Sequence, residues 1–493
     1  MTDSNRVQLT HVRESTLGVT PGSPRMRKVR FTGEALSYAP VFVNSAEIRD
    51  NRMMSDPIKV NETHGGTVNG ELSFPPDSSP YSDWLESVFC REWSLTPVRE
   101  NDGTADSVIT GVAASSDTFT VTDTGPDFVA GHLVLASGFG QAGNNGLFRA
   151  ETGSNGTSLV VASAPGLTDE AAPPADARLK VVGLQGASGD IAAVADGLTS
   201  SANLFGTLPE LVVGKWIKIG GTGAGFRFAT AACNGWARIV AVAAGKLTLD
   251  NLPAGWTTDA GTGKTLRVFV GDQLKNGVET LGQTLERGYL GQQTPTYIAE
   301  AGMVVGQMEW QFPWDDKATW TATFMGMTGG QGTTALDASP DAATTNVVMA
   351  AGVNVGRIAE NGAVISGPNY VRSMSLSVQN NLRAKGAIRG DGNVGPVDIG
   401  KGKFNVSVTA ETYFGSNALL TKLFAGTPTN INARIAKNGQ ALIFGVPRIT
   451  FGEGSPNASG EDQDVMLSLT ATASRDSLTD AHLLLDRLEY FED

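Results

Sequence analysis

The chain has 493 residues, with 37 Lys or Arg against 50 Asp or Glu, so its formal net charge is −13. A chain this acidic is a poor candidate for binding nucleic acid, because phosphate recognition needs a basic surface. Apolar residues make up 41% of the chain, which argues against disorder, and 60 glycines argue against a helical bundle, so the composition favours strands joined by tight turns.

Alternation of apolar with small polar residues predicts five strands along the chain. In each, one face is apolar and the other carries mostly Ser, Thr, Asn, Gln or Glu. This pattern is typical of antiparallel sheets with one face on a core and the other wet. The predicted strands lie at residues 68–74, 308–312, 374–378, 404–411 and 465–472.

Two short amphipathic helices are predicted, each following one of these strands. The first starts at Ser79, with Pro80 in the first helical position, and the second starts near Ser416 and ends at Gly426. Their apolar stripes, which we expect to pack on a sheet, are Trp84, Leu85, Val88 and Phe89 in the first and Leu419, Leu420, Leu423 and Phe424 in the second. The similar order and spacing of strand, loop, strand and helix indicate a duplicated unit at the two ends of the chain.

A second, shorter repeat lies between the two parts of the first unit. Residues 128–135 match 211–218, residues 145–149 match 234–238, and residues 158–161 match 246–249. Both copies are glycine-rich and all β by pattern, which predicts two small inserted β modules.

Cysteine usage and the chain start predict a reducing compartment. The two cysteines are too few for a disulfide framework, and Cys90, next to Phe89, is expected to be a buried free thiol. The first residues lack the apolar core of a signal peptide, and no apolar run is long enough to cross a membrane.

No chemical motif predicts catalysis. The histidines show no metal-ligand spacing, although scattered acids leave a folded metal site as a minor alternative; they are His11, His64, His132 and His482. Residues 261–265 resemble the end of a phosphate-binding loop, and residues 390–395 fit G-x-G-x-x-G, but a strand pattern follows each where a helix is required. We therefore predict no catalytic, cofactor-binding or metal-ligating residue, no cofactor, and a protein that is not an enzyme.

Both end units resemble the major tail tube proteins of bacteriophages with long non-contractile tails. No single motif is diagnostic, and the order of many carries the resemblance. The segments are 16–24, 28–34, 48–49, 51–53 and 55–57 in the first unit, and 379–383, 402–407, 413–414, 464–466 and 485–487 in the second.

The resemblance implies a structural subunit that forms rings, which stack into a hollow tube for DNA passage during ejection. In the family fold, one sheet of each unit contributes to a β-barrel around the lumen, with a helix packed outside. We expect the small polar faces to line this channel and to be net negative, with Glu71, Glu309 and Glu411 as candidates taken as a set. Like charges would then keep passing DNA from adhering.

The fold class predicted is mainly β: two tandem tail-tube-type sandwich or barrel units, each with one short packing helix, plus the two inserted modules. The predicted boundaries are an N-terminal arm (1–30), a split first unit (31–105 and 274–330), module 1 (106–186), module 2 (187–273), a linker (331–346) and a second unit (347–493). Residues 1–30 and 49–64 are expected to bridge neighbouring subunits, and the modules are expected to project outward.

The predicted partner is the chain itself. Single-unit relatives form six-membered rings, so two units per chain predict a homotrimer, with a hexamer as the alternative. Other tail proteins (tape measure, terminator and distal tail) would meet the tube ends, DNA would pass without specific binding, and no membrane insertion is expected. The protein would be a virion tail component assembled in the host bacterial cytoplasm.

Two other classes of function stay open from the sequence. A carbohydrate-binding or adhesin-like protein would use Trp216, Trp236 and Trp256 of the modules, if these side chains are exposed. A hydrolase embedded in a tail is the third class, and the missing catalytic motifs count against it.

Overall fold

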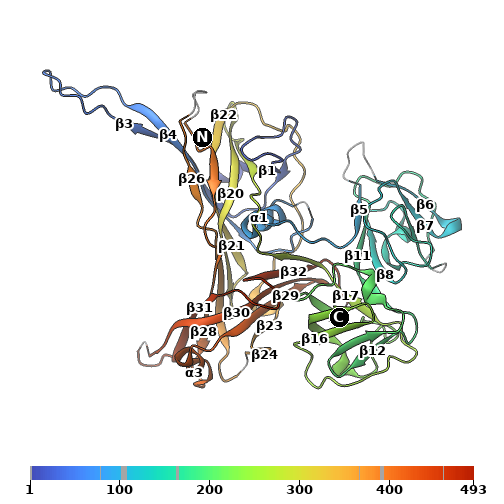
Figure 1. Ribbon diagram of the computed structural model, residues 1–493. Helices are drawn as coiled ribbons and strands as arrows, with labels where there is room; N and C mark the ends of the chain where they lie inside the picture. The colour runs from blue at the N-terminus through green and yellow to red at the C-terminus, as the bar shows by residue number, and fades with distance from the viewer. Residues whose placement is uncertain are drawn as a thin grey trace.

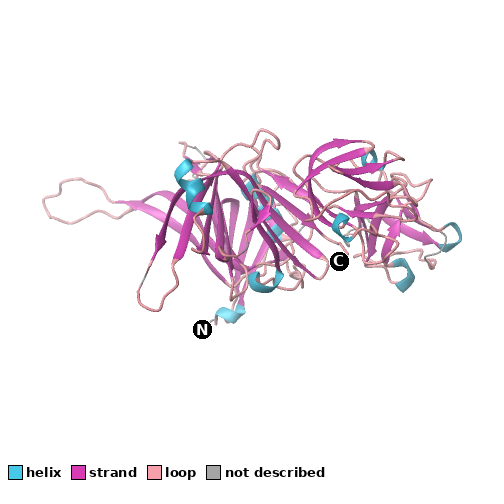
Figure 2. Ribbon diagram, turned by 90° about the horizontal axis from the view of Figure 1, so that it is seen from below, coloured by secondary structure: helices cyan, strands magenta, loops and turns pink. Residues whose placement is uncertain are grey.

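The structure, a computed structural model, describes residues 3–77, 79–101, 108–162, 166–365, 367–388, 394–458 and 460–492. Antiparallel sheets dominate these residues, and the helices are short (Figure 2). This confirms the predicted fold class, although the long sheet of a single chain does not close into a barrel. The domain boundaries stay a prediction.

One 17-stranded sheet runs through both end units. Its strands in the first unit are β1 (Val7–Arg13), β2 (Arg27–Lys28), β3 (Gly33–Val43), β4 (Ile58–Glu71), β18 (Asp272–Lys275), β19 (Gln283–Tyr289), β20 (Thr296–Pro313), β21 (Thr319–Gly326) and β22 (Thr328–Gly332). Those in the second are β23 (Val355–Glu360), β24 (Ala363–Val364), β25 (Val371–Gln379), β28 (Asn405–Tyr413), β29 (Thr429–Lys437), β30 (Gln440–Asn457), β31 (Met466–Ala473) and β32 (Leu484–Leu488).

Eight of these strands lie side by side in the order β3, β4, β21, β20, β25, β28, β31, β30, and every neighbouring pair is antiparallel. The pairing of β20 with β25 joins the two units without a break in the sheet. All five predicted strands overlap strands of this row, although β4 ends at Glu71, three residues before the predicted end, and their apolar positions face one shared core. That core includes Val68, Trp310, Leu376, Val408 and Leu469.

Helix α1 (Pro80–Phe89) has the predicted bounds and cap. The Ser79 hydroxyl accepts a hydrogen bond from the Ser82 amide, and all four residues of the predicted stripe are buried. Cys90 caps the C-terminus in the left-handed conformation and is a buried free thiol, as predicted; Cys233 is buried and free as well.

Helix α3 (Ala418–Ala425) ends at Gly426 as predicted, but most of its stripe does not pack within the chain. Only Leu419 is buried; Leu420 and Leu423 are half-buried, and Phe424 is 79% exposed. The expectation that the whole stripe covers a sheet is therefore wrong for one isolated chain. The remaining helix, α2 (Ala351–Asn354), is a single turn, and 3-10 turns occupy Ser4–Arg6, Ala114–Ser116, Ala142–Asn144, Leu204–Thr207 and Ala231–Cys233.

The residues between the two parts of the first unit form a separate body beside the long sheet (Figure 1). Its ten-stranded sheet consists of β5 (Val98–Glu100), β8 (His132–Ser137), β9 (Gly146–Arg149), β11 (Arg178–Gln185), β12 (Ile191–Val194), β13 (Gly197–Ser200), β14 (Trp216–Ile219), β15 (Gly235–Ala243), β16 (Lys246–Asp250) and β17 (Arg267–Phe269). A three-stranded sheet consists of β6 (Ile109–Ala113), β7 (Thr118–Val121) and β10 (Ser158–Val160). Strands β26 (Arg383–Lys385) and β27 (Asp398–Gly400) form a small hairpin elsewhere.

The internal repeat of this body shows in its loops. The side-chain oxygen of Asn145 accepts from the Phe139 amide at 3.0 Å, and that of Asn234 accepts from the Phe228 amide at 2.9 Å. Each asparagine also donates back to the carbonyl of the same phenylalanine. The same loop geometry thus occurs at matching positions of both copies.

The two segments expected to be arms differ from each other. Residues 7–13 of the N-terminal segment form β1, which pairs with β19 of the same chain, so this part belongs to the sheet and is not an extended arm. The β3–β4 hairpin, in contrast, projects far from the body (Figure 1), and its tip spans residues 44–57. Exposed apolar side chains gather on it: Val41, Phe42, Val43, Ile48, Met53, Met54, Ile58 and Val60.

Candidate functional site

The long sheet has a continuous polar face opposite its core. Along β4, β21, β20, β25, β28 and β31, residues that alternate with the buried positions point to this face and are half-buried or exposed. They are Thr67, Asn69 and Glu71; Thr319, Thr321 and Thr323; Gln307, Glu309 and Gln311; Ser373, Ser375, Ser377 and Gln379; Asn405, Ser407, Thr409 and Glu411; and Ser468, Thr470 and Thr472. The face therefore spans both units and consists of short uncharged side chains with a few carboxylates.

The three predicted acids lie on this one face. Glu71 is opposite Thr319, Glu309 is opposite Ser377, and Glu411 is opposite Ser373. Glu71 forms an ion pair with Lys317 at 2.6 Å, at the end of the sheet. Each of the other two glutamates has hydroxyl or amide neighbours.

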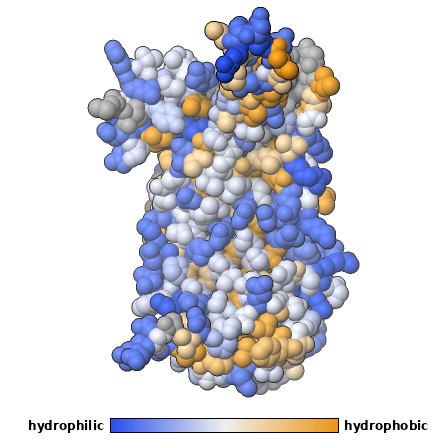
Figure 3. Space-filling view, turned by 90° about the vertical axis from the view of Figure 1, so that its left-hand side faces the viewer, coloured by the Kyte–Doolittle hydropathy of each residue, from blue (hydrophilic) through white to orange (hydrophobic). Residues whose placement is uncertain are grey.

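A fourth carboxylate, Glu453 on β30, is opposite Thr470 on β31. It extends the same face to the edge of the sheet. Its segment lacks clean alternation because a β-bulge lies between Phe451 and Glu453. The sequence pattern therefore gave no signal for it. Seen from the side away from the inserted modules, the surface is mostly hydrophilic or neutral, with apolar residues gathered near the lower end, where Figure 1 places α3 (Figure 3).

The row of eight strands ends in two free edges. Strand β3 pairs only with β4, and residues 450–457 of β30 pair only with β31, within the part of the chain that the structure describes. Free edges present unpaired backbone groups and are templates for joining another chain. The long sheet is thus open on both sides.

Buried charges lie where the modules meet the end units, and sequence reasoning missed them. Arg487 on β32 donates from Nε to Asp272 at 2.9 Å and also pairs with Asp77, which precedes α1. Lys180 on β11 reaches the same two carboxylates at 2.6 and 2.8 Å, and Arg178 pairs with Asp77 as well. This set, called the junction cluster below, ties together segments far apart in the chain.

Electrostatics keep the junction cluster charged. Burial alone raises the pKa of Asp77, but Lys180, Arg487 and Arg178 outweigh it and hold that pKa well below its usual range. The pKa of Asp272 is lowered in the same way, against its own burial, by Lys180 and Arg487. An apolar contact reinforces the junction, where Trp216 and Trp236 of the modules pack with Ile443 and Leu488.

His11 and Asp83 form a buried pair, with His11 Nε2 3.2 Å from an Asp83 carboxyl oxygen. Burial, with a smaller contribution from Arg27, lowers the pKa of His11 to about 3. Burial, together with Glu86, raises the pKa of Asp83 to about 7. His11 is fully buried beside Trp84, and the Asp83 side chain is 11% exposed, so the pair belongs to the packing of α1 against β1.

Asp83 predicts a pH dependence of stability. Its folded pKa lies above the usual value, so its contribution to stability is complete below about pH 4 and is lost as pH rises through 7. Asp83→Asn keeps a donor for His11 and cannot ionise. From pH 4.5 to 7.5, wild type should lose about 3 kcal/mol of stability relative to this variant. Urea unfolding of both proteins at the two pH values checks this, and parallel pH dependence would contradict it.

Neither of the remaining glycine motifs is followed by a helix: β17 follows the first, and β27 follows the second. Residues 261–265 form a turn before β17, where Lys264 Nζ donates to the Ala224 carbonyl at 2.8 Å. Residues 389–393, which hold most of the G-x-G-x-x-G pattern, lie outside the described residues. Within the described ranges, no group of three or more His, Cys, Asp or Glu residues is placed to hold a metal ion, and no helix is long and apolar enough to span a membrane.

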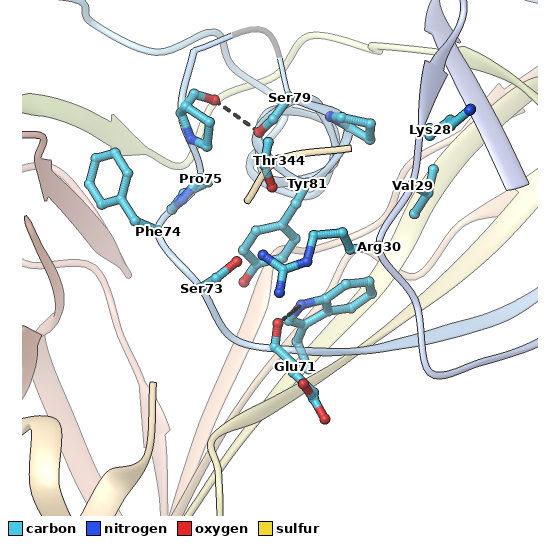
Figure 4. Close-up of a pocket in the computed structure, with 13 residues that line it drawn as sticks. Lys28, Val29, Arg30, Glu71, Ser73, Phe74, Pro75, Ser79, Tyr81 and Thr344 are labelled. Carbon is cyan, nitrogen blue, oxygen red and sulfur yellow. Dashed lines mark hydrogen bonds between the residues drawn. The ribbon is translucent and has the colours of Figure 1, made fainter. Parts of the chain in front are cut away.

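A small cavity lies between α1 and the edge of the polar face. Figure 4 shows Tyr81 and Arg30 projecting into it, with Glu71 and Ser73 at its side. Its volume of about 30 Å³ suits a water molecule and is far below the roughly 300 Å³ of a typical ligand pocket. This cavity is therefore too small for a substrate. Larger hollows of about 330 to 480 Å³ lie elsewhere, and the one of about 480 Å³ is lined by Gln307 and Thr323 of the polar face. The polar face and the free edges, which extend over both units, are the candidate functional features.

A family model described as phage tail tube protein matches the chain twice, over residues 4–204 and 168–473. No curated protein matches the chain.

Proposed function

The chain belongs to the phage tail tube protein family and is a structural component of the virion tail that assembles into a tube; from this premise we propose how it does so. Copies join through the free edges of the long sheet into rings, and the rings stack. The polar face lines the channel through which DNA passes during ejection, in a non-contractile tail. The protein has no enzymatic activity in this proposal.

The continuous polar face across both units carries the proposal. A sheet needs only one apolar face to fold, so the other face is free to contact water. Here that face is made of Ser, Thr, Asn and Gln, which hydrogen-bond to water and offer a phosphate backbone no cation. The channel surface also carries the negative charges of Glu309, Glu411 and Glu453. These charges repel DNA and so shorten the time that it stays in contact with the surface.

Three chains complete a ring in this proposal. The number of strands and their tilt fix the circumference of a barrel. Family tubes of single-unit subunits have six units to a ring, and this chain supplies two in one sheet. The ring then has true threefold and approximate sixfold symmetry, which is a closed cyclic form. A hexamer would require one unit of each chain to lie outside the barrel.

The inserted modules project outward from the tube in this proposal. They lie on the opposite side of the chain from the long sheet's hairpin (Figure 1). Assembly takes place in the host cytoplasm, and the tape measure, terminator and distal tail proteins meet the tube at its ends.

The carbohydrate-binding alternative loses its main support in the structure. Trp216 and Trp236 are buried, at 2% and 9% exposure, so neither offers a flat face for a sugar ring. Trp256 is half-buried and donates from its ring nitrogen to the Val194 carbonyl at 2.8 Å. No other observation favours that function.

Electron microscopy of the purified full-length chain, with native mass measurement, tests the proposal. We expect stacked rings with a central hole, three chains to a ring, and the polar face on the lumen. Six chains to a ring would refute the trimer alone. Dispersed monomers at high concentration, or a lumen lined by Lys and Arg, would overturn the proposed function.

A further inference from the structure

The two end units repeat each other strand by strand. In the first, β1 pairs with β2 and β19, and β20 pairs with β19, β21 and β22. In the second, β23 pairs with β24 and β29, and β30 pairs with β29, β31 and β32. The hairpin β3–β4 corresponds to β25 and β28, each followed by a helix. Every strand of one unit's four-stranded row thus has a counterpart in the other.

The residue-level correspondence is fixed by a shared β-bulge. The ladder of β20 with β21 shifts between Val305 and Gln307, and the ladder of β30 with β31 shifts between Phe451 and Glu453. Matching these bulges equates Gln307 with Glu453. From these two residues the paired positions can be followed across each unit, through β21, β4 and β3 in the first and through β31, β28 and β25 in the second. Leu36 of β3 then occupies the position that Leu376 occupies in β25.

The row of eight strands contains one junction between units, and the same two strand types are left free at the ends of the row; the other pairing between units, β18 with β32, lies outside this row. Inside the chain, β20 of the first unit pairs antiparallel with β25 of the second, with Glu309 opposite Ser377. The counterparts of these strands are β30 and β3, which are the two free edges. The row has eight alternating strands, so β30 of one copy meets β3 of the next in the antiparallel sense.

We propose that the junction within the chain is repeated between chains, in the same register. This inference rests on the proposed function and names the second copy of the chain as the partner of each free edge. Residues 453–457 of one copy lie antiparallel to residues 35–39 of the next. Glu453 is opposite Ala39, Ser455 is opposite Ser37, and Asn457 is opposite Ala35.

In this register Pro456 lies opposite Leu36 and cannot donate a backbone hydrogen bond, but the Leu36 carbonyl that would accept it is already hydrogen-bonded within its own chain. The Leu36 amide donates to its own chain's Glu34 at 2.9 Å, so the backbone groups of Leu36 face the free edge. Its rung partner is Pro456, which has no N–H to give. The Leu36 carbonyl already accepts from Arg287 Nη1 at 2.7 Å. The Leu36 amide can turn to the Pro456 carbonyl, and the rung then leaves no backbone group unpaired.

The exposed helix α3 supports the same junction. Both helices end in a left-handed cap, which is Cys90 in α1 and Gly426 in α3. When the two caps are aligned, Val88 and Phe424, each two residues before its cap, occupy equivalent positions. Val88 is fully buried, and its carbonyl accepts from Asn380, which follows β25. The register equates Asn380 with residue 40, at the base of the projecting hairpin. The hairpin of the next copy therefore covers Phe424, with its own apolar residues 41–43 close by.

Cysteine cross-linking tests the register. In the proposed junction Ser37 and Ser455 form a rung of close side chains, suited to a disulfide. Full-length Ser37→Cys/Ser455→Cys is assembled under reducing conditions, checked by microscopy and then oxidised. We expect a disulfide between chains, at least tenfold more than in Ser37→Cys/Asn457→Cys, which is out of register by two residues. Glu309→Cys/Ser377→Cys is the matched control and should link within one chain.

The outcomes separate the register from the proposed function. Rings that link Ser37→Cys to Asn457→Cys, or that form without either link, would overturn the register and leave the tube intact. A wild-type chain that forms no ring would overturn the proposed function. If the first pair of substitutions prevents assembly, Ala39→Cys/Glu453→Cys tests the same register independently. The native Cys90 and Cys233 are buried and should add little background.

Discussion

Replacing Phe424 with Asp is expected to weaken ring and tube assembly at least tenfold while leaving the monomer folded. Phe424 is 79% exposed in the single chain, so its removal costs the monomer little. In the proposed junction it is covered by the neighbour's hairpin. Burying a phenylalanine contributes about 1.5–3 kcal/mol, and burying a carboxylate there costs more. Because 1.4 kcal/mol is a factor of ten, the critical concentration for assembly should rise at least tenfold.

Sedimentation of assembled tubes across a concentration series measures this effect, and circular dichroism checks the fold. The matched control is Val242→Asp on β15 of the modules, which changes an exposed apolar residue outside the junction. We expect Val242→Asp to assemble like wild type. If Phe424→Asp forms tubes at the wild-type concentration, α3 is not covered by a neighbour and the junction needs another arrangement.

Much of the sheet could be predicted from sequence because its signal is local. Alternation of Val406, Val408 and Ala410 with Ser and Thr requires only that one face is buried. The Ser79–Pro80 start and the Gly426 stop are likewise local signals of chain geometry. These rules placed both helices, and they placed Glu71, Glu309 and Glu411 on one face.

Features that depend on distant partners were not predictable in the same way. Whether the stripe of α3 is covered depends on what lies beside residues 450–457 of β30, and among the described residues of one chain only β31 pairs there. The segment 7–13 became a sheet strand because β19, more than 270 residues later, offers its edge. Glu453 was hidden by a β-bulge, which shifts the alternation by one residue.

The junction cluster left only a faint trace in the sequence. Lys180 lies between apolar residues of strand β11, and all of β11 beyond its first residue is buried. A lysine in such a run signals a buried partner, because an unpaired charge there would be too costly. The sequence does not show which carboxylates pair with Lys180, because Asp77 and Asp272 are some 100 and 90 positions away.

Replacing Arg487 with Ala is expected to be the most destabilising single change. Its guanidinium is 2% exposed and donates to Asp272, to the Ser82 hydroxyl at 2.7 Å and to the Pro75 carbonyl at 2.9 Å. It also stacks over Trp93, at 4.0 Å from the ring centre. The variant leaves two buried carboxylates with fewer cations, and breaking a buried pair in this way costs about 3–5 kcal/mol.

Denaturant unfolding measures this loss, and the Phe424→Asp background keeps the protein monomeric so that assembly does not add to the apparent stability. The matched control is Arg475→Ala. Arg475 pairs with Asp480 at 2.6 Å, but both side chains are more than 60% exposed, and such surface pairs contribute about 0–1 kcal/mol. A loss of less than about 1 kcal/mol for Arg487→Ala would show that Lys180 and Arg178 suffice for Asp77 and Asp272. A large loss confined to Arg487→Ala would support coupled folding of the modules and both end units, because Arg487, on the final strand, pairs with Asp77 before α1 and with Asp272 at the end of the module insertion.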